Sequence, residues 1–408
     1  MYCGNTNHSK YAKCYLVIII IAVTFCSTFV NYAKFAYAEE PENNLQQELE
    51  NKVEDYLNNI DFSELEQYFN ENADYYYNIF GISDYKEFLI ELISGNILTD
   101  FNSVFDFIAV NIKENLSLFL SPLLLILVIS LICVVFKSIR PKAARSSVSE
   151  VIFFICFSAI ICILTIIVGN MFSTVKIIIS RMQNQMNAIF PILLFLMNAA
   201  GGSISVKAFQ PIVLLLSNSI SNIFVNVLLP IVVIVFVLAM VGNLSPNSKL
   251  NGLTDFFKSA FKWIIGIVFT VYMAFMGIQG ITASSADGIS IRTAKFAIKN
   301  YIPMLGGYIS DGFEVARVGA SIIKNAVGFS GIILILTTVL SPIIIIAILQ
   351  LSLKLVAGIV EPLSESRTGG LLIAASKSIS MLVTIIIGVA MMYFVIVFLL
   401  MCSVSGAI

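Results

Sequence analysis

The hydrophobic positions of this chain form long, nearly uninterrupted runs. An α-helix needs about 20 consecutive apolar residues to cross the hydrocarbon core of a bilayer. Runs that approach or exceed this length cover residues 116–136, 151–171, 263–281, 332–353 and 371–402. The pattern therefore predicts an all-α, polytopic membrane protein whose membrane domain occupies residues 116–408.

Polar residues interrupt the apolar pattern between residues 176 and 241. Phe190-Pro191 and the glycine-rich stretch that ends at Ser205 predict the tip of a helical hairpin, because glycine permits tight turns. The following run carries many serine and asparagine side chains before Pro230, which predicts a helix that faces protein or water and is kinked at the proline. We expect amphipathic or re-entrant structure over about residues 176–208, and one, two or three crossings remain open for the whole region.

The N-terminus has the organisation of a secretory signal peptide. Lys10 and Lys13 form a positive region, an apolar stretch covers residues 15–30, and Ala36-Tyr37-Ala38 forms a small-x-small cleavage site. We therefore predict that residues 1–38 are a signal peptide cleaved after Ala38. An uncleaved signal anchor is the alternative.

The composition argues against a soluble enzyme. Hydrophobic residues make up 58% of the 408 residues and charged residues 12%, whereas a soluble domain is about 45–50% apolar and about 25% charged. The single histidine, His8, lies in the predicted signal peptide, so the mature chain would lack histidine for catalysis or metal binding. We expect no enzyme activity, catalytic residue, cofactor or metal, and no nucleic-acid binding.

Residues 39–115 are strongly acidic, with 18 acidic and 3 basic residues. Apolar residues at helical spacing predict a small acidic helical domain, with Ser63 as an N-cap and Glu66 as its capping-box partner. Tyr75-Tyr76-Tyr77 predicts packing among these helices or at the membrane interface, or a patch for a partner. The basic loop at residues 137–145 lies on the cytoplasmic side by the positive-inside rule, which places the acidic domain outside the cytoplasm.

Residues 282–325 hold most of the ionisable residues of the C-terminal half. Pro303 and Gly306-Gly307 divide two amphipathic segments over about residues 284–327, which predicts helices lying in the membrane interface or a re-entrant hairpin. Their charges would either sit among headgroups or line a pore. The candidate pore or assembly residues are Asp287, Arg292, Lys295, Lys299, Asp311, Glu314, Arg317 and, in the last loop, Glu361.

Several short motifs in this segment resemble stage III sporulation protein AE of endospore-forming Firmicutes. They are Ala286-Asp287-Gly288, Ile291 to Phe296 (IRTAKF) and Asn300-Tyr301-Ile302-Pro303, supported by Phe190-Pro191, Gly201-Gly202 and Glu361-Pro362-Leu363. The resemblance covers about residues 39–405 and is densest from 282 to 330.

The resemblance implies a membrane component of the channel, or feeding-tube, complex that links mother cell and forespore after engulfment. It implies the mother-cell membrane around the forespore as the location. The implied partners are other stage III sporulation A membrane proteins and stage II sporulation protein Q. Assembly into a homo-oligomer is a further alternative. A stand-alone secondary transporter is the alternative, and an intramembrane enzyme using Asp287 and Asp311 is a weaker one.

Overall fold

The computed structural model describes residues 53–71, 73–94, 109, 113, 123–132, 147–244, 250–301, 306–361 and 366–403. Within these ranges the secondary structure is helical and contains no strand, which confirms the all-α class. The predicted signal peptide (residues 1–38) and the basic loop at residues 137–145 lie outside the described residues, as does Pro303.

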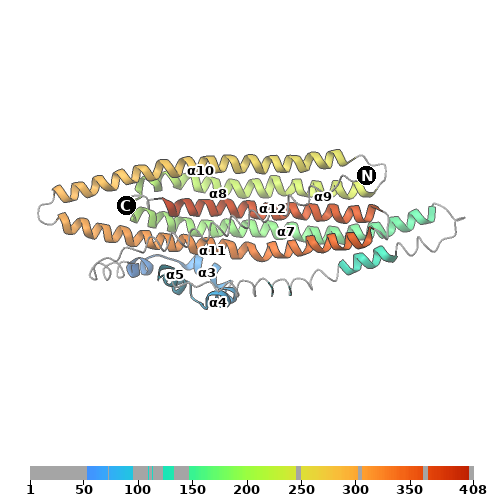
Figure 1. The fold of residues 1–408 in the computed structure, drawn as a ribbon, viewed down its shortest axis with the longest axis horizontal. Helices are drawn as coiled ribbons and strands as arrows, with labels where there is room; N and C mark the ends of the chain where they lie inside the picture. The colour runs from blue at the N-terminus through green and yellow to red at the C-terminus, as the bar shows by residue number, and fades with distance from the viewer. Residues whose placement is uncertain are drawn as a thin grey trace. The chain divides into compact units, whose positions relative to one another are not determined.

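Long helices run alongside one another in Figure 1. They are α7 (Ser147–Ala199), α8 (Ser203–Ile223), the π-helical turn η1 (Phe224–Leu228), α9 (Leu229–Leu244), α10 (Asn251–Tyr301), α11 (Gly306–Val360) and α12 (Ser366–Cys402). The longest are α7, α10 and α11, with 53, 51 and 55 residues. At 1.5 Å per residue each is about 75–85 Å long, more than twice the ~30 Å hydrocarbon core. These helices therefore extend well beyond a bilayer.

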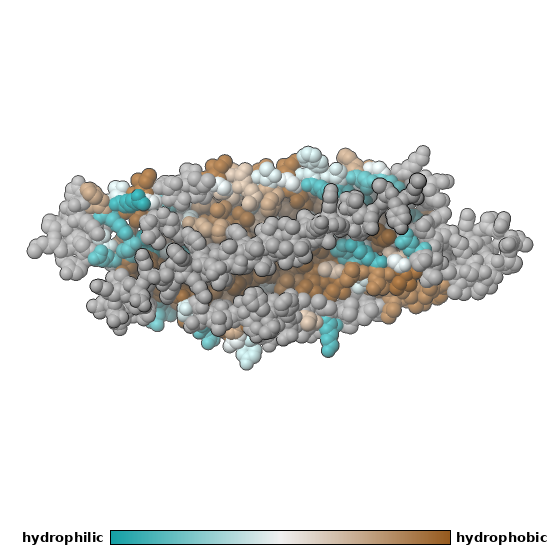
Figure 2. Space-filling view, in the orientation of Figure 1, coloured by the Kyte–Doolittle hydropathy of each residue, from teal (hydrophilic) through white to brown (hydrophobic). Residues whose placement is uncertain are grey.

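Five of the described helical stretches are long and apolar enough to cross a membrane: Phe154–Ala199, Ser203–Leu244, Asn251–Ile278, Ser310–Val360 and Thr368–Cys402. A shorter apolar helix, Leu123–Ile132, lies within the predicted first span. Hydrophobic side chains dominate the middle of the helices in Figure 2, and hydrophilic ones gather towards their ends. The chain is therefore a multi-pass membrane protein.

Helix α12 forms the centre of the bundle and packs against α7, α9, α10 and α11. Its most apolar window is 50% buried, against 17% for that of α10, which lies on the outside. The Tyr272 hydroxyl on α10 donates to the Met392 carbonyl at 2.5 Å, and the hydroxyls of Tyr393 and Ser221 share a hydrogen bond of 2.9 Å. These contacts place α8, α10 and α12 in register along the bundle.

Helices run through most of the two segments expected to be amphipathic or re-entrant, over about residues 176–208 and 284–327. Helix α7 continues without a break through Pro191 to Ala199, and α10 continues to Tyr301. A proline inside a membrane helix is tolerated because neighbouring groups replace the lost backbone hydrogen bond. Within these two regions the described helices are separated by the short turn before Ser203 and by the connection between α10 and α11.

A π-helical turn precedes Pro230, the position at which a kink is predicted. Residues Phe224–Leu228 form η1, which ends two positions before the proline. Proline cannot donate a backbone hydrogen bond and crowds the carbonyl four residues earlier, at Asn226. The wider π turn accommodates this defect within a helix that otherwise continues from α8 into α9.

The acidic region contributes α3 (Ser63–Asn70), α4 (Ala73–Phe80) and α5 (Tyr85–Ser94). Phe69 stacks on Tyr76 with ring centroids 4.1 Å apart, and both side chains are fully buried. The predicted capping box at Ser63 does not form. Instead the Ser63 amide donates to Asp61 at 3.0 Å, and this hydrogen bond holds the pKa of Asp61 below its usual value.

Candidate functional site

Asp287 lies at the end of the bundle where α7 turns into α8. Its carboxylate accepts backbone hydrogen bonds from Ile204 (3.0 Å, to Oδ1) and Ser205 (3.2 Å, to Oδ2). These amides belong to the first turn of α8, whose N-cap residue, Gly202, has no side chain to cap them. The free amides and the dipole of a helix N-terminus favour a carboxylate there. Asp287, which is fully buried, therefore caps α8 from a different helix.

The turn that Asp287 supports is a Schellman motif. The Gly202 amide donates to the Met197 carbonyl at 2.8 Å, and the Gly201 amide donates to the Asn198 carbonyl at 3.0 Å. Gly201 has φ of +93°, a backbone conformation that favours glycine, and a Cβ atom there would lie 3.2 Å from Ile291 on α10. Glycine at position 201 therefore permits a tight turn that packs directly on α10.

An ion-pair cluster joins α10 to α11 at the same end of the bundle. Lys295 lies 2.5 Å from Glu314, and Arg317 donates to the same carboxylate at 2.5 Å. Arg317 is 5% exposed, whereas Lys295 and Glu314 are about a third exposed. A cation at 5% exposure needs such a partner, because an unpaired buried charge is strongly unfavourable. The cluster thus holds the two helices together where the chain reverses.

Lys324 secures the C-terminal end of α12. It is fully buried and donates to the Ser403 carbonyl at 2.5 Å. The Ser403 hydroxyl contacts the Met197 sulfur at 2.7 Å, which links the same point to α7. A cation is favourable at a helix C-terminus, where carbonyl groups lack partners. Lys324 was not among the predicted site residues, although it lies two helical turns after Arg317.

Arg292, Asp311 and Glu361 take no part in these contacts among the described residues. Arg292 and Asp311 are exposed, and the side chain of Lys299 lies outside the described set. Glu361 follows the end of α11, about 70 Å along that helix from Glu314. Of the predicted residues, the structure therefore joins Asp287, Lys295, Glu314 and Arg317 to the charged end of the bundle and separates Glu361 from it.

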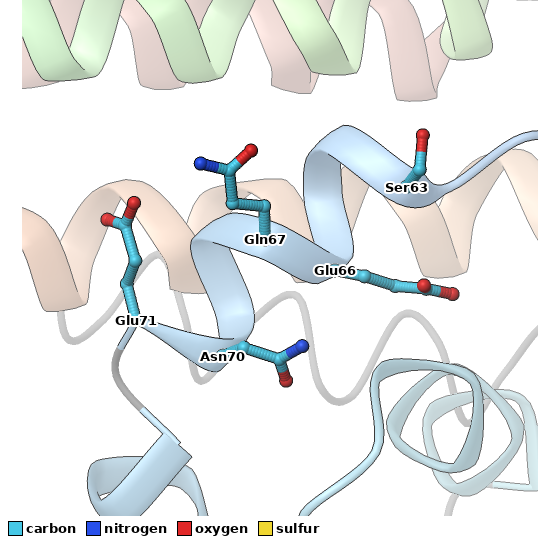
Figure 3. Close-up of a pocket in the computed structure, with 5 residues that line it drawn as sticks. All are labelled: Ser63, Glu66, Gln67, Asn70 and Glu71. Carbon is cyan, nitrogen blue, oxygen red and sulfur yellow. The ribbon is translucent and has the colours of Figure 1, made fainter.

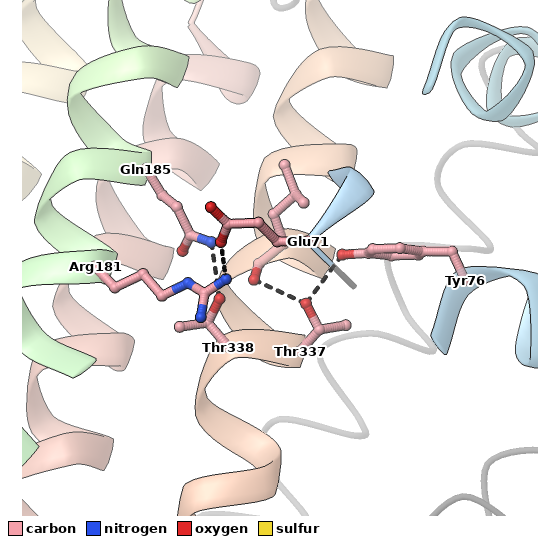
Figure 4. Close-up of polar contacts among 7 residues, drawn as sticks. Glu71, Tyr76, Arg181, Gln185, Thr337 and Thr338 are labelled. Carbon is pink, nitrogen blue, oxygen red and sulfur yellow. Dashed lines mark hydrogen bonds and ion pairs between the residues drawn. The ribbon is translucent and has the colours of Figure 1, made fainter. Parts of the chain in front are cut away.

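A second polar site lies where the acidic helices meet the bundle, as Figure 4 shows. Arg181 on α7 forms an ion pair with Glu71, which follows α3. The Tyr76 hydroxyl shares a hydrogen bond of 2.9 Å with Thr337 on α11. Beside them, the Gln185 amide of α7 donates to Thr338 at 2.8 Å. Polar residues inside apolar stretches of α7 and α11 thus have protein partners.

Tyr85 makes a further contact between the acidic helices and α11. Its hydroxyl and that of Ser330 share a hydrogen bond of 2.8 Å, and both residues are buried. Burial raises the pKa of the Tyr85 hydroxyl above its usual value, because the phenolate would lose its hydration. The acidic helices are therefore fastened to the bundle along α11 as well as α7.

A shallow hollow lies along α3 and is drawn in Figure 3. Its lining residues are Ser63, Glu66, Gln67, Asn70 and Glu71. All of them belong to α3 or follow it directly, so the hollow is one face of a short helix. Among the residues that the structure describes, no cluster of histidine, cysteine or carboxylate side chains is arranged to hold a metal ion.

The fold defines a polytopic α-helical membrane protein, and the charged residues at one end of its bundle form hydrogen bonds and ion pairs between helix ends. The sequence profile of the family described as Stage III sporulation protein AE matches residues 83–405. The chain belongs to this family. It is 26% identical over 273 residues to Stage III sporulation protein AE of Bacillus subtilis (strain 168), covering 66% of this chain and 67% of that protein. No solved structure matches it significantly.

Proposed function

We propose that this chain is a non-enzymatic component of the membrane channel complex that links mother cell and forespore, and that it is needed for forespore development after engulfment. Family membership gives the sporulation role. One structural observation favours assembly over catalysis: Asp287, in the segment richest in family-like motifs, has its carboxylate engaged by two backbone amides. A carboxylate held as a helix cap is a poor acid or base for an intramembrane reaction.

The same geometry argues against a pore lined by residues 284–327. Glu314 and Arg317 bond each other and Lys295, and Lys324 bonds the end of α12. Charges that are satisfied within the bundle offer little to a passing solute. The charged end instead resembles a rigid platform that other components of the complex can contact, so the chain need not form the conduit by itself.

The proposed orientation places the charged end outside the mother-cell cytoplasm, in the mother-cell membrane around the forespore. The basic residues 137–145 directly precede the start of α7 at Ser147. The positive-inside rule assigns this start to the cytoplasm, so the turn at Gly201 lies on the other side. The acidic N-terminal region would share that side and face the intermembrane space.

The proposed partners are other stage III sporulation A membrane proteins and, through the complex, stage II sporulation protein Q. The test is affinity isolation of the tagged full-length chain from sporulating cells after mild solubilisation. We expect these proteins to be recovered with the tagged chain and not with an equally abundant, tagged multi-pass protein unrelated to sporulation. Recovery of the chain without them, at a time when all are present, would contradict membership of the complex.

A further inference from the structure

Asparagine side chains line the outer face of α8 and η1. Asn218, Asn222 and Asn226 follow one another at intervals of four residues, and all are exposed. The Asn226 amide donates to Asn222 Oδ1 at 3.3 Å, so the side chains are neighbours on the surface. Gln183 on α7 donates to Asn218 Oδ1 at 2.7 Å, which extends the face onto the next helix. These four residues are called the asparagine face.

At the position of the asparagine face along the bundle axis, another side of the bundle is apolar. Ser221, beside Asn222, bonds Tyr393, and Tyr272 on α10 bonds the adjacent Met392. Val271 precedes Tyr272 and is 62% exposed, and exposed Ile267 lies one turn away. One side of this level therefore suits lipid, whereas the other presents amide groups that lipid cannot satisfy.

On the neighbouring part of α7, polar side chains at the same position along the bundle axis bond to other parts of the chain. Arg181 and Gln185, on α7 close to Gln183, have protein partners in Glu71 and Thr338. Asn222 and Asn226 remain exposed, so none of the described part of the chain covers them. An asparagine amide offers two donors and an acceptor, and an uncovered set of them inside a membrane calls for a polar partner.

We propose that the asparagine face is a self-association surface that binds a second copy of this chain in the same membrane. Its side chains carry no charge and both donate and accept hydrogen bonds, so the surface is complementary to itself. Two copies with the same orientation are related by an axis along the membrane normal. Each residue near that axis then meets its own counterpart at the same depth.

An apolar groove between α7 and α9 continues the face and gives the second copy a packing surface. The groove, of about 370 Å³, is lined by residues that include Gly169 and Phe172 of α7 and Val237 and Met240 of α9. A Cβ atom placed on Gly169 would meet nothing within 4 Å. Small residues beside hydrogen-bonding ones are typical of interfaces between membrane helices.

The test is cysteine cross-linking of the full-length chain in membranes of a non-sporulating host, which makes the result independent of the proposed sporulation role. All native cysteines are replaced, and Asn222→Cys is compared with Val271→Cys, which is exposed at the same level on α10. A short bifunctional maleimide should join Asn222→Cys into a covalent dimer at least tenfold more efficiently than Val271→Cys. Equal yields would indicate random collision and overturn the proposal.

Other outcomes exclude other occupants of the face. An Asn222→Cys variant that stays monomeric yet reacts with a membrane-impermeant thiol reagent would show water at the face and overturn the proposal. A monomer that reacts with neither reagent would show that lipid or another part of the chain covers the asparagine face. This result would also overturn the proposal. As an independent measurement, replacing Asn218, Asn222 and Asn226 with leucine should lower the dimer fraction of the purified protein at least tenfold. Leu214→Ala and Leu215→Ala serve as matched changes on the same helix.

Discussion

The carboxylate of Asp287 lies 3.2 Å from the backbone nitrogen of Ser205, although the two residues are separated by 82 positions in the sequence. Helix α8 begins after Gly202, which cannot cap it, and α10 supplies the missing acceptor. The contact fixes the α7–α8 turn against α10, and the Lys295–Glu314–Arg317 cluster fixes α10 against α11. Helix ends that could move independently are thereby joined into one charged surface.

Removing the Asp287 carboxylate should destabilise this end of the bundle. Asp287→Ala leaves buried backbone amides without an acceptor, and we expect a loss of about 1–3 kcal/mol in the free energy of unfolding. Asp287→Asn keeps one acceptor oxygen and should lose less. Thermal unfolding in detergent measures both, with the exposed Asp311→Ala as the control. Equal melting temperatures for Asp287→Ala and Asp311→Ala would refute the capping role.

The two arginines of the family-like segment should differ in importance. Arg317 is 5% exposed and bonds Glu314, whereas Arg292 is exposed. Arg317→Met leaves the Glu314 carboxylate with Lys295 alone, so it should lower stability and spore yield more than Arg292→Met does. Heat-resistant spore counts from strains that carry each allele test this. A larger defect for Arg292→Met would instead indicate that the exposed surface is the critical feature.

The Arg181–Glu71 ion pair should control attachment of the acidic helices. Both side chains are partly exposed, so the pair itself contributes about 1 kcal/mol or less. Arg181→Glu places two like charges together and should increase amide hydrogen exchange in α3 to α5 severalfold. The double exchange Arg181→Glu with Glu71→Arg should restore much of the protection, whereas Arg292→Glu should leave these helices unchanged. Failure of the double exchange to restore protection would count against the ion pair.

Tyr85 should make the protein sensitive to alkaline pH. Its pKa is raised in the folded state by burial, and the unfolded value is about 10. Below pH 10 both states keep the proton; above it the unfolded state loses its proton first, so the free energy of unfolding falls as pH rises. Tyr85→Phe should weaken this dependence, as measured by denaturation between pH 9 and about 11. An unchanged slope would show that Tyr85 does not contribute.

The apolar runs were sufficient to predict the helical membrane class, because each run of about 20 residues has few alternatives to a spanning helix. The continuity of α7 was not predictable from the same pattern. Arg181 and Gln185 interrupt its hydrophobicity, and their partners, Glu71 and Thr338, are more than a hundred residues away. Local sequence alone therefore could not show that tertiary contacts sustain one continuous helix from Ser147 to Ala199.

The candidate residues were chosen because charges are costly inside membranes, and among them Asp287, Lys295, Glu314 and Arg317 make contacts between or within helices. This reasoning could not separate them from Arg292 and Asp311, because exposure depends on which face of α10 or α11 meets the bundle. It also overlooked Lys324, whose role appears only when the end of α12 is placed beside it. A spacing of seven residues from Arg317 was the one available signal.

The proposed role of this chain in the channel complex can be tested by deletion of its gene in the source organism, followed by fluorescence microscopy of forespores after engulfment. A strain complemented with the intact gene serves as the control. We expect arrest after engulfment, with shrunken forespores that cease transcription, and recovery in the complemented strain. Full-sized, transcriptionally active forespores that mature into heat-resistant spores would contradict it.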